Sequence, residues 1–280
     1  MKNEGIKYVL ISVGLFALVY TFVKFLAHIP AQEIILFRSI VSLTISLTHL
    51  KILNISPWGN NKKWLVIRGI SGIIALTMFF YTIKHMPLAS AVTIQYLSPV
   101  FTVILAIFIN NQKVNPIQWL YLFMAFVGVI LIKGWDERIS INMLLIGMSA
   151  AFFAGIAYNA IIKCRKTDHP VVVVMYFPLI ATPIMAVWSW FYWVQPIGIE
   201  WLLLFAIGAL TQAAQVYMTK ALHADHASKI TPFKYLGTLF ALLVGYAIFD
   251  ERLHLFSLLG MGLVVFGVIM NSKQKLKPLT

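Results

Sequence analysis

The chain has 280 residues, of which 60% are hydrophobic and only 11% are charged. A soluble domain covers its core with roughly 25% charged residues, so this composition excludes an ordinary soluble protein and indicates that lipid surrounds most of the surface. The formal net charge of +13 would suit either a nucleic-acid partner or a membrane topology, so the positions of the basic residues must decide between them.

Apolar runs separated by turn signals predict an all-α integral membrane protein of ten transmembrane helices. Crossing a hydrocarbon layer of ~30 Å takes about 20 apolar residues, so ten spans leave room for short loops and for no separate soluble domain. The first run follows a short polar lead without a small-residue cleavage site, which favours a permanent helix over a cleaved signal. In chain order the predicted helices cover 8–27, 33–50, 64–84, 88–109, 116–132, 142–163, 171–194, 201–222, 227–249 and 254–271.

The basic residues predict the orientation. With the N-terminus in the cytoplasm, fourteen of the 22 lysines and arginines fall on the cytoplasmic side and five on the opposite side. This bias predicts a multi-pass protein of the cell membrane, here the bacterial inner membrane, with both termini cytoplasmic. Topology therefore explains the net charge, and no nucleic-acid partner is expected.

The sequence also contains an internal repeat. The segment 95–114 aligns without a gap on 234–253 when 139 is added to each position, and tyrosine, phenylalanine and turn residues coincide. We therefore expect two five-helix repeats, 1–138 and 139–280, the second with a short basic cytoplasmic tail. Because each repeat has an odd number of spans, the two would have opposite orientations, which is the architecture of alternating access around a midplane site.

Motifs in both halves resemble one known family over essentially the whole chain. They are Phe37-Arg38-Ser39, Arg68-Gly69 through Tyr81, Pro87 to Ala91, Tyr96 to Phe101, and Pro232-Phe233-x-Tyr235 followed by Gly245 and Asp250-Glu251. Together they resemble the EamA-type transporters of the drug/metabolite transporter superfamily. The resemblance implies ten helices around a central cavity lined mainly by helices 1, 3, 4, 6, 8 and 9. It names no cargo, since members carry amino acids, sugars, nucleotide conjugates and drugs.

The chain departs from the family pattern at two places. The first half has neutral residues at 110–112 where an acidic turn would be, and the ninth helix carries Lys234. An uncompensated ammonium inside the membrane costs about 2.5–3.5 kcal/mol on insertion scales. We interpret Lys234 as a contact for an anionic group of the substrate; the alternatives are snorkelling to the interface or a bond to carbonyls that Pro232 frees.

Further polar residues lie on the cavity helices that the resemblance indicates. A polar stripe with three- and four-residue spacing runs along the ninth helix through Ser228, Thr231, Tyr235 and Thr238. Gln95, the repeat partner of Lys234, gives the fourth helix a similar patch together with Tyr96 and Ser98. Any one of these residues could instead make an interhelical hydrogen bond. For Arg38 and Arg68 we expect structural roles, either binding carbonyls or holding gates. The candidate substrate-binding residues are Lys234, Tyr235, Thr231, Gln95, Tyr96, Gln212, Gln215, Tyr81, Thr77, Tyr20 and Asn159.

These features favour a transporter that moves a small organic metabolite, an amino acid or a similar compound, by alternating access. A carboxylate on the cargo is left open, and the alternative is an exporter of drugs or toxic metabolites. A membrane-embedded enzyme is disfavoured because the nine acidic residues do not cluster. The histidines show no metal-ligand spacing, so no cofactor is expected. No midmembrane carboxylate is found, which favours a facilitator or exchanger over proton antiport, and the expected partners are the substrate and the bilayer, with the protein as a monomer.

Overall fold

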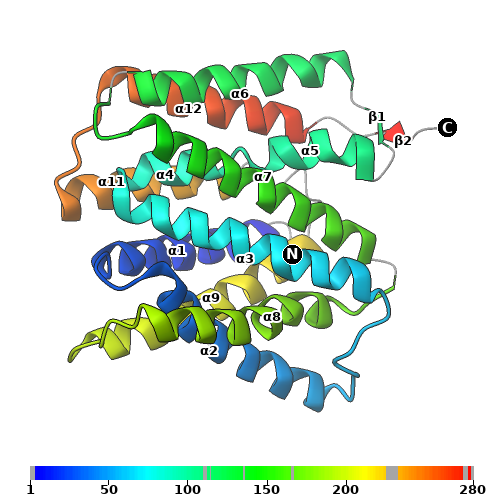
Figure 1. The fold of residues 1–280 in the computed structure, drawn as a ribbon. Coiled ribbons are helices and arrows are strands. Elements are labelled where there is room, and N and C mark those ends of the chain that lie inside the picture. The colour runs from blue at the N-terminus through cyan, green and yellow to red at the C-terminus, as the bar shows by residue number, and fades with distance from the viewer. Residues whose placement is uncertain are drawn as a thin grey trace.

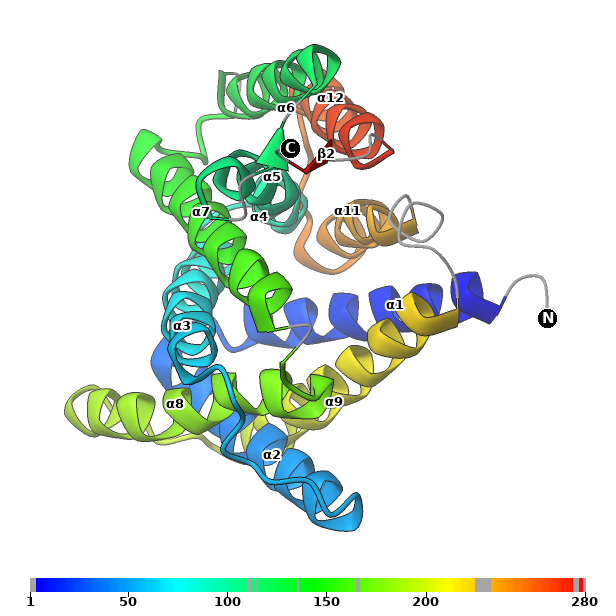
Figure 2. The same ribbon diagram turned by 90° about the vertical axis from the view of Figure 1, so that its right-hand side faces the viewer.

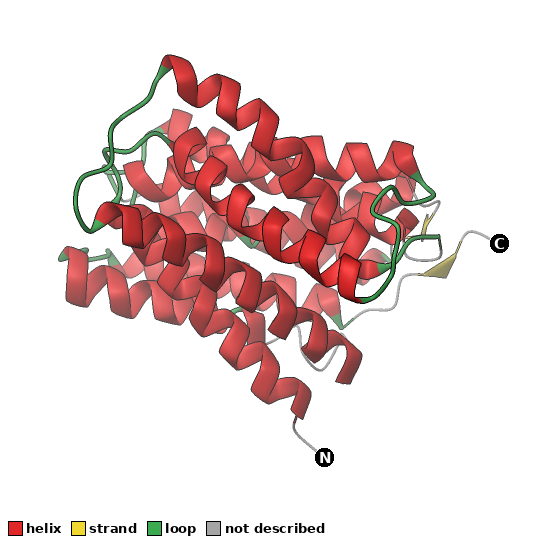
Figure 3. Cartoon of the chain, turned by 90° about the horizontal axis from the view of Figure 1, so that it is seen from below, coloured by secondary structure: helices red, strands yellow, loops and turns green. Residues whose placement is uncertain are grey.

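The computed structural model describes residues 4–109, 112–113, 115–134, 136–164, 167–224, 233–273 and 277–278. These residues form a bundle of helices whose connecting loops gather at two ends (Figures 1 and 3). The exception is a short antiparallel pair, in which β1 (Gln112–Lys113) meets β2 (Lys277–Pro278). The expected all-helical class is confirmed.

The helices of the first half are α1 (Glu4–Phe25), α2 (Ala31–Ile52), α3 (Lys62–His85), α4 (Leu88–Gln95), α5 (Ser98–Ile109) and α6 (Pro116–Gly134). Those of the second half are α7 (Ile141–Cys164), α8 (Pro170–Phe191), α9 (Glu200–Ala224), α11 (Leu236–Phe249) and α12 (Leu255–Ser272). Most bounds agree with the apolar runs to within a few residues. Among the described residues, seven segments are long and apolar enough to cross a membrane, counting α4 and α5 as one. The segments 116–132, 236–249 and 255–271 are shorter apolar helices.

The predicted fourth helix is interrupted where the sequence contains a proline. The chain turns at Tyr96 and Leu97, and α5 begins just before Pro99. A proline inside a helix lacks an N–H donor and its ring collides with the carbonyl four residues earlier, here that of Gln95. The ninth predicted helix turns at the repeat-related position, Tyr235, which follows the helical residues Phe233 and Lys234 and precedes α11. Its predicted start, 227–232, lies outside the described residues.

Helices of the two halves pack against one another throughout the bundle. Equivalent helices meet in the pairs α6–α12 and α2–α8, and other contacts between the halves come in related pairs: α3–α7 with α1–α9, α3–α8 with α2–α9, and α5–α7 with α1–α11. The pair α4–α11 joins the fourth predicted helix to the ninth. Figure 2 shows α6 and α12 at one side of the bundle and α2 and α8 at the other. In the α6–α12 pair the backbones touch, because a Cβ on Gly260 would lie 2.5 Å from the carbonyl oxygen of Gly128.

The charges distinguish the two ends of the bundle. Glu33, Asp136, Glu200, Asp250 and Glu251 gather at the end where α1 meets α2 and α11 meets α12, here called the acidic end, on the left in Figure 1. The opposite end, here called the basic end, holds the start of α1 and the β1–β2 pair. Large apolar side chains such as Leu202, at 63% exposed, cover the sides of the bundle between these ends, as a lipid-facing surface requires.

Candidate functional site

The two interrupted helices meet near the centre of the bundle. The Tyr96 hydroxyl, at the end of α4, donates a hydrogen bond of 2.7 Å to the backbone carbonyl of Lys234. The rings of Tyr96 and Tyr235 pack edge to face with centroids 4.9 Å apart, and the Tyr96 hydroxyl fills the space where a Cβ of Gly237 would lie. Thus each half contributes its own interruption to one shared contact, called the crossing from here on.

Lys234 lies at the crossing without a counter-ion. The structure gives its ammonium no hydrogen bond and no ion pair within the described ranges. Every described carboxylate lies in a loop or within the first turn of a helix. At the equivalent position of the first half, the Gln95 side-chain oxygen is buried and also has no partner in the described part of the chain. The crossing therefore presents an unused donor and an unused acceptor, as a polar binding site would.

Four tyrosines gather around the crossing, here called the tyrosine cluster: Tyr20 of α1, Tyr96, Tyr158 of α7, and Tyr235. The Tyr96 hydroxyl lies within electrostatic range of the other three. Tyr158 is 50% exposed although Tyr20, Tyr96 and Tyr235 lie within electrostatic range of it. The space beside Tyr158 is thus not filled by the side chains that the structure describes. Tyr158 was not among the predicted site residues.

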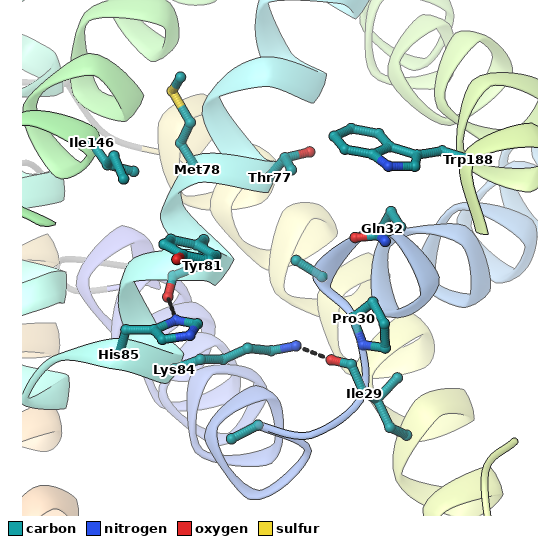
Figure 4. A pocket seen from close by; sticks show the side chains of 12 residues that line it. Ile29, Pro30, Gln32, Thr77, Met78, Tyr81, Lys84, His85, Ile146 and Trp188 are labelled. Carbon is teal, nitrogen blue, oxygen red and sulfur yellow. Dashed lines mark hydrogen bonds between the residues drawn. The ribbon is translucent and has the colours of Figure 1, made fainter. Parts of the chain in front are cut away.

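Two predicted residues lie elsewhere, in a pocket near the acidic end. Thr77 and Tyr81 line a pocket of about 480 Å³ between α3, the start of α2 and the end of α8 (Figure 4). The Tyr81 ring stacks on His85 with centroids 4.1 Å apart, and the Lys84 ammonium donates to the Ile29 carbonyl. The rest of the wall is largely apolar. This pocket is distinct from the crossing.

The remaining predicted residues are placed as follows. The Asn159 side chain is fully buried and donates to the carbonyls of Thr102 and Gly155, so it joins α7 to α5. Gln212 and Gln215 lie on α9, the first buried and the second partly buried. Thr231 lies outside the described residues. The structure therefore brings Lys234, Tyr235, Gln95, Tyr96 and Tyr20 together and places Asn159 in a helix contact.

Arg38 and Arg68 do not have the carbonyl partners expected of them. Both guanidinium groups contact the same ring, that of Phe177 on α8, at 5.1 and 5.4 Å from its centroid. Their buried N–H groups, Nε and Nη1 of Arg38 and Nε of Arg68, have no acceptor among the residues that the structure describes. The sequence shows two arginines inside spans, but it does not show that they converge on one ring.

The acidic end is closed by polar contacts. The Lys24 ammonium forms an ion pair with Glu251 and donates to the Met86 carbonyl, and the second Glu251 oxygen accepts from the Leu88 N–H at 2.8 Å. These bonds tie α1 and the start of α4 to the loop after α11. A carboxylate at a helix N-terminus is also favourable for the helix dipole.

A second ion pair lies in the loop after α6. Arg138 forms two hydrogen bonds of 2.8 Å with Asp136 and donates to the Arg252 carbonyl. Burial raises the pKa of the Asp136 carboxyl, but the hydrogen bonds and charge of Arg138 outweigh burial, so the pKa lies below its usual value. Asp136 is thus held ionised, and Arg138 links the loops of the two halves.

Comparisons with known proteins agree with this architecture. The chain is 28% identical over 251 residues to the pseudopaline exporter CntI of Pseudomonas aeruginosa, covering 89% of this chain and 88% of that protein. It is 27% identical to the human solute carrier family 35 member G1, covering 88% and 73%. It is 25% identical to an S-adenosylmethionine uptake transporter of Rickettsia prowazekii, covering 66% and 63%.

A solved crystal structure shares the fold with a TM-score of 0.60 at 16% identity, covering 94% of this chain and 95% of that one. The family model described as the EamA-like transporter family matches residues 3–134 and again 141–273. Both halves of the chain are therefore matched by the same model. The chain belongs to the EamA-like transporter family, and it is a multi-pass membrane transporter rather than an enzyme.

Proposed function

We propose that this protein carries a small organic metabolite, an amino acid or a similar compound, by alternating access, and that the cargo binds at the crossing. One observation carries the proposal: Lys234 lies beside the tyrosine cluster with an ammonium that no described carboxylate neutralises. A charge inside a membrane protein is costly, and where it is retained it commonly marks a substrate path. An anionic group of the cargo would supply the missing partner.

The packing of the helices supports ten spans in two inverted repeats. When the two halves are exchanged, the pair α3–α7 becomes α1–α9 and the pair α3–α8 becomes α2–α9, so these contacts between the halves map onto one another. Because each unit would have an odd number of spans, two consecutive copies in one chain would have opposite orientations. Rocking one repeat against the other would expose the crossing first at one end and then at the other.

The contacts at the acidic end support a conformation closed to the outside. Under the orientation that the lysines and arginines favour, the acidic end faces away from the cytoplasm. The ion pair of Lys24 with Glu251 then acts as an outer gate. A cysteine introduced at Asn61, at the basic end, should resist impermeant maleimide in intact cells, and labelling there would reverse the orientation.

The relatives support a metabolite as the cargo. One is named as an exporter of pseudopaline and another as an uptake transporter of S-adenosylmethionine. Both names give an organic metabolite as the cargo, but they give opposite directions of transport. An exporter of drugs or toxic metabolites is the second candidate. The pocket near the acidic end favours it, since Ile29, Met78 and Trp188 offer a largely apolar wall.

Flux into proteoliposomes tests the proposal. The purified full-length protein would be reconstituted, and uptake of labelled amino acids, organic acids and S-adenosylmethionine measured with and without unlabelled compound inside. We expect saturable uptake that internal substrate stimulates. Lys51→Met, which removes the charge of an exposed lysine, should retain this uptake. Flux of apolar dyes alone would support the second candidate. Correctly folded protein that moves none of these metabolites would contradict the proposal.

A further inference from the structure

Arg38 and Arg68 form a pair of cations on one aromatic ring. They come from different helices, α2 and α3, and the Phe177 ring of α8 lies at 5.1 Å from one guanidinium and 5.4 Å from the other. The two charges are also within electrostatic range of each other. Two like charges within electrostatic range of each other repel, so a structural role would require acceptors to compensate the two guanidinium charges.

Such acceptors are missing from the described part of the chain. Nε and Nη1 of Arg38 and Nε of Arg68 are buried without a hydrogen bond, and no ion pair includes either residue. The titratable groups that face the pair are Tyr20, Tyr158 and Cys164, and none of these is a carboxylate. A buried donor without an acceptor normally costs about 1–3 kcal/mol, more when it is charged, so the free N–H groups need an explanation.

The surrounding residues hold the guanidinium groups in place. Gly72 on α3 leaves the space that Arg68 Nη1 and the Phe177 ring occupy, since a Cβ there would lie 2.8 Å from the nitrogen and 2.9 Å from the ring. A guanidinium that packs on an aromatic face keeps its N–H edge free to bind an oxyanion with two parallel hydrogen bonds. The guanidinium groups are thus held against the ring, with N–H groups that have no acceptor among the described residues.

We propose that Arg38 and Arg68, packed on Phe177, form an oxyanion-binding site that receives an acidic group of the cargo. This inference rests on the proposed function and specifies its substrate class, an organic acid with a carboxylate or a phosphate. The site borders the tyrosine cluster, because Tyr20 lies within electrostatic range of Arg38 and Tyr158 within range of Arg68. The site is separate from Lys234, which lies at the crossing just before α11.

Thermal unfolding of the purified full-length protein tests the site without requiring flux. The probes are citrate, succinate and inorganic phosphate, with succinamide as the neutral analogue, at matched ionic strength. Because a ligand that binds the native state stabilises it, we expect at least one acid to raise the Tm of the wild type by a few degrees and succinamide to have no effect. The acid that acts distinguishes a carboxylate site from a phosphate site.

The variants are Arg38→Gln and Arg68→Gln, with Arg252→Gln as a matched control because that side chain is 82% exposed. We expect each buried variant to weaken binding of the active acid at least tenfold, and the control to bind as the wild type does. Arg38→Lys and Arg68→Lys keep the charge but not the planar donor pair, so they should bind with intermediate affinity even if the Gln variants do not fold. Equal binding in wild type and all four buried variants would overturn the site, as would the absence of any shift in the wild type.

The same variants separate this inference from the proposed function. If acids bind through the arginines but no flux occurs in proteoliposomes, the transporter mechanism fails and the site stands. If metabolites are transported normally by Arg38→Lys, Arg68→Lys and both Gln variants, the site fails and the transporter mechanism stands.

Discussion

In the first half of the chain the helix turns at Tyr96 and Leu97 between α4 and α5, and in the second half it turns at Tyr235 just before α11. These positions are related by the repeat, but the side chains at the two interruptions have different roles. The first interruption carries the neutral Gln95, and its tyrosine reaches across to the backbone of the other half. The second carries Lys234, whose ammonium has no partner in the described residues.

The comparison shows how a duplicated unit can supply two functions at one place. The first interruption contributes structure, because the Tyr96 hydroxyl satisfies the Lys234 carbonyl at 2.7 Å. The second contributes charge. The same division recurs at the ends of these helices, where Glu251 after α11 accepts from the first N–H of α4, whereas the equivalent residue of the first half is the neutral Gln112.

The largest effect is expected when the charge itself is removed. Lys234→Met should lower transport at low substrate concentration by roughly 10- to 100-fold, because a hydrogen bond to a charged group contributes about 1.5–3 kcal/mol to binding. Gln95→Met, the same change at the equivalent position, should reduce transport only slightly. Proteoliposome flux measures both. Normal flux in Lys234→Met would remove the anionic contact at the crossing and leave a neutral or cationic cargo.

The second prediction concerns the outer gate. Glu251→Gln loses the ion pair with Lys24 but can still accept from Leu88, so the acidic end should open more often. In a Cys164→Ser background, a cysteine at Ala89, which is 1% exposed, should then react several-fold faster with impermeant maleimide in intact cells. Arg252→Gln, at an exposed residue of the same loop, is the control. Unchanged labelling in Glu251→Gln would mean that the ion pair does not hold the gate.

A third change tests how closely the two interruptions pack. Gly237→Ala places a Cβ where the Tyr96 hydroxyl lies, and such overpacking costs about 1–3 kcal/mol. The equivalent residue of the first half is Ser98, so the crossing tolerates a side chain on one side only. Gly262→Ala, whose Cβ would meet nothing within 4 Å, should leave the Tm unchanged or raise it slightly. A Tm for Gly237→Ala equal to that of the wild type would show that Tyr96 moves aside freely.

The sequence alone predicts the helix bounds well and the site only in part. Apolar runs and Pro99 determine where helices begin, end and turn, and these are local properties. The rotation of a helix about its axis depends on its neighbours and cannot be read from the helix alone. The prediction therefore chose Asn159, whereas the structure buries Asn159 and exposes Tyr158. Gly155 and Asn159, one turn apart, form a small and polar face typical of a helix contact, and that spacing is the signal that could have separated them. The convergence of Arg38 and Arg68 on Phe177 involves three helices and has no local signal.

The smallest predicted effect separates the two tyrosines of the crossing. Tyr96→Phe removes the hydroxyl that donates to the Lys234 carbonyl, and an unpaired buried carbonyl costs about 1–3 kcal/mol. Tyr235→Phe should lower the Tm only slightly, because Tyr235 contributes a ring contact and its hydroxyl makes no hydrogen bond to any residue that the structure describes. Thermal unfolding of the two variants compares them directly. Tyr96→Phe should also weaken substrate binding if the interruption of the first half supports that of the second. The carbonyl that this variant leaves unpaired belongs to Lys234, so the backbone that positions the Lys234 ammonium loses a restraint. Equal Tm values for the two variants would mean that water replaces the Tyr96 hydroxyl, and the crossing would then depend on ring packing alone.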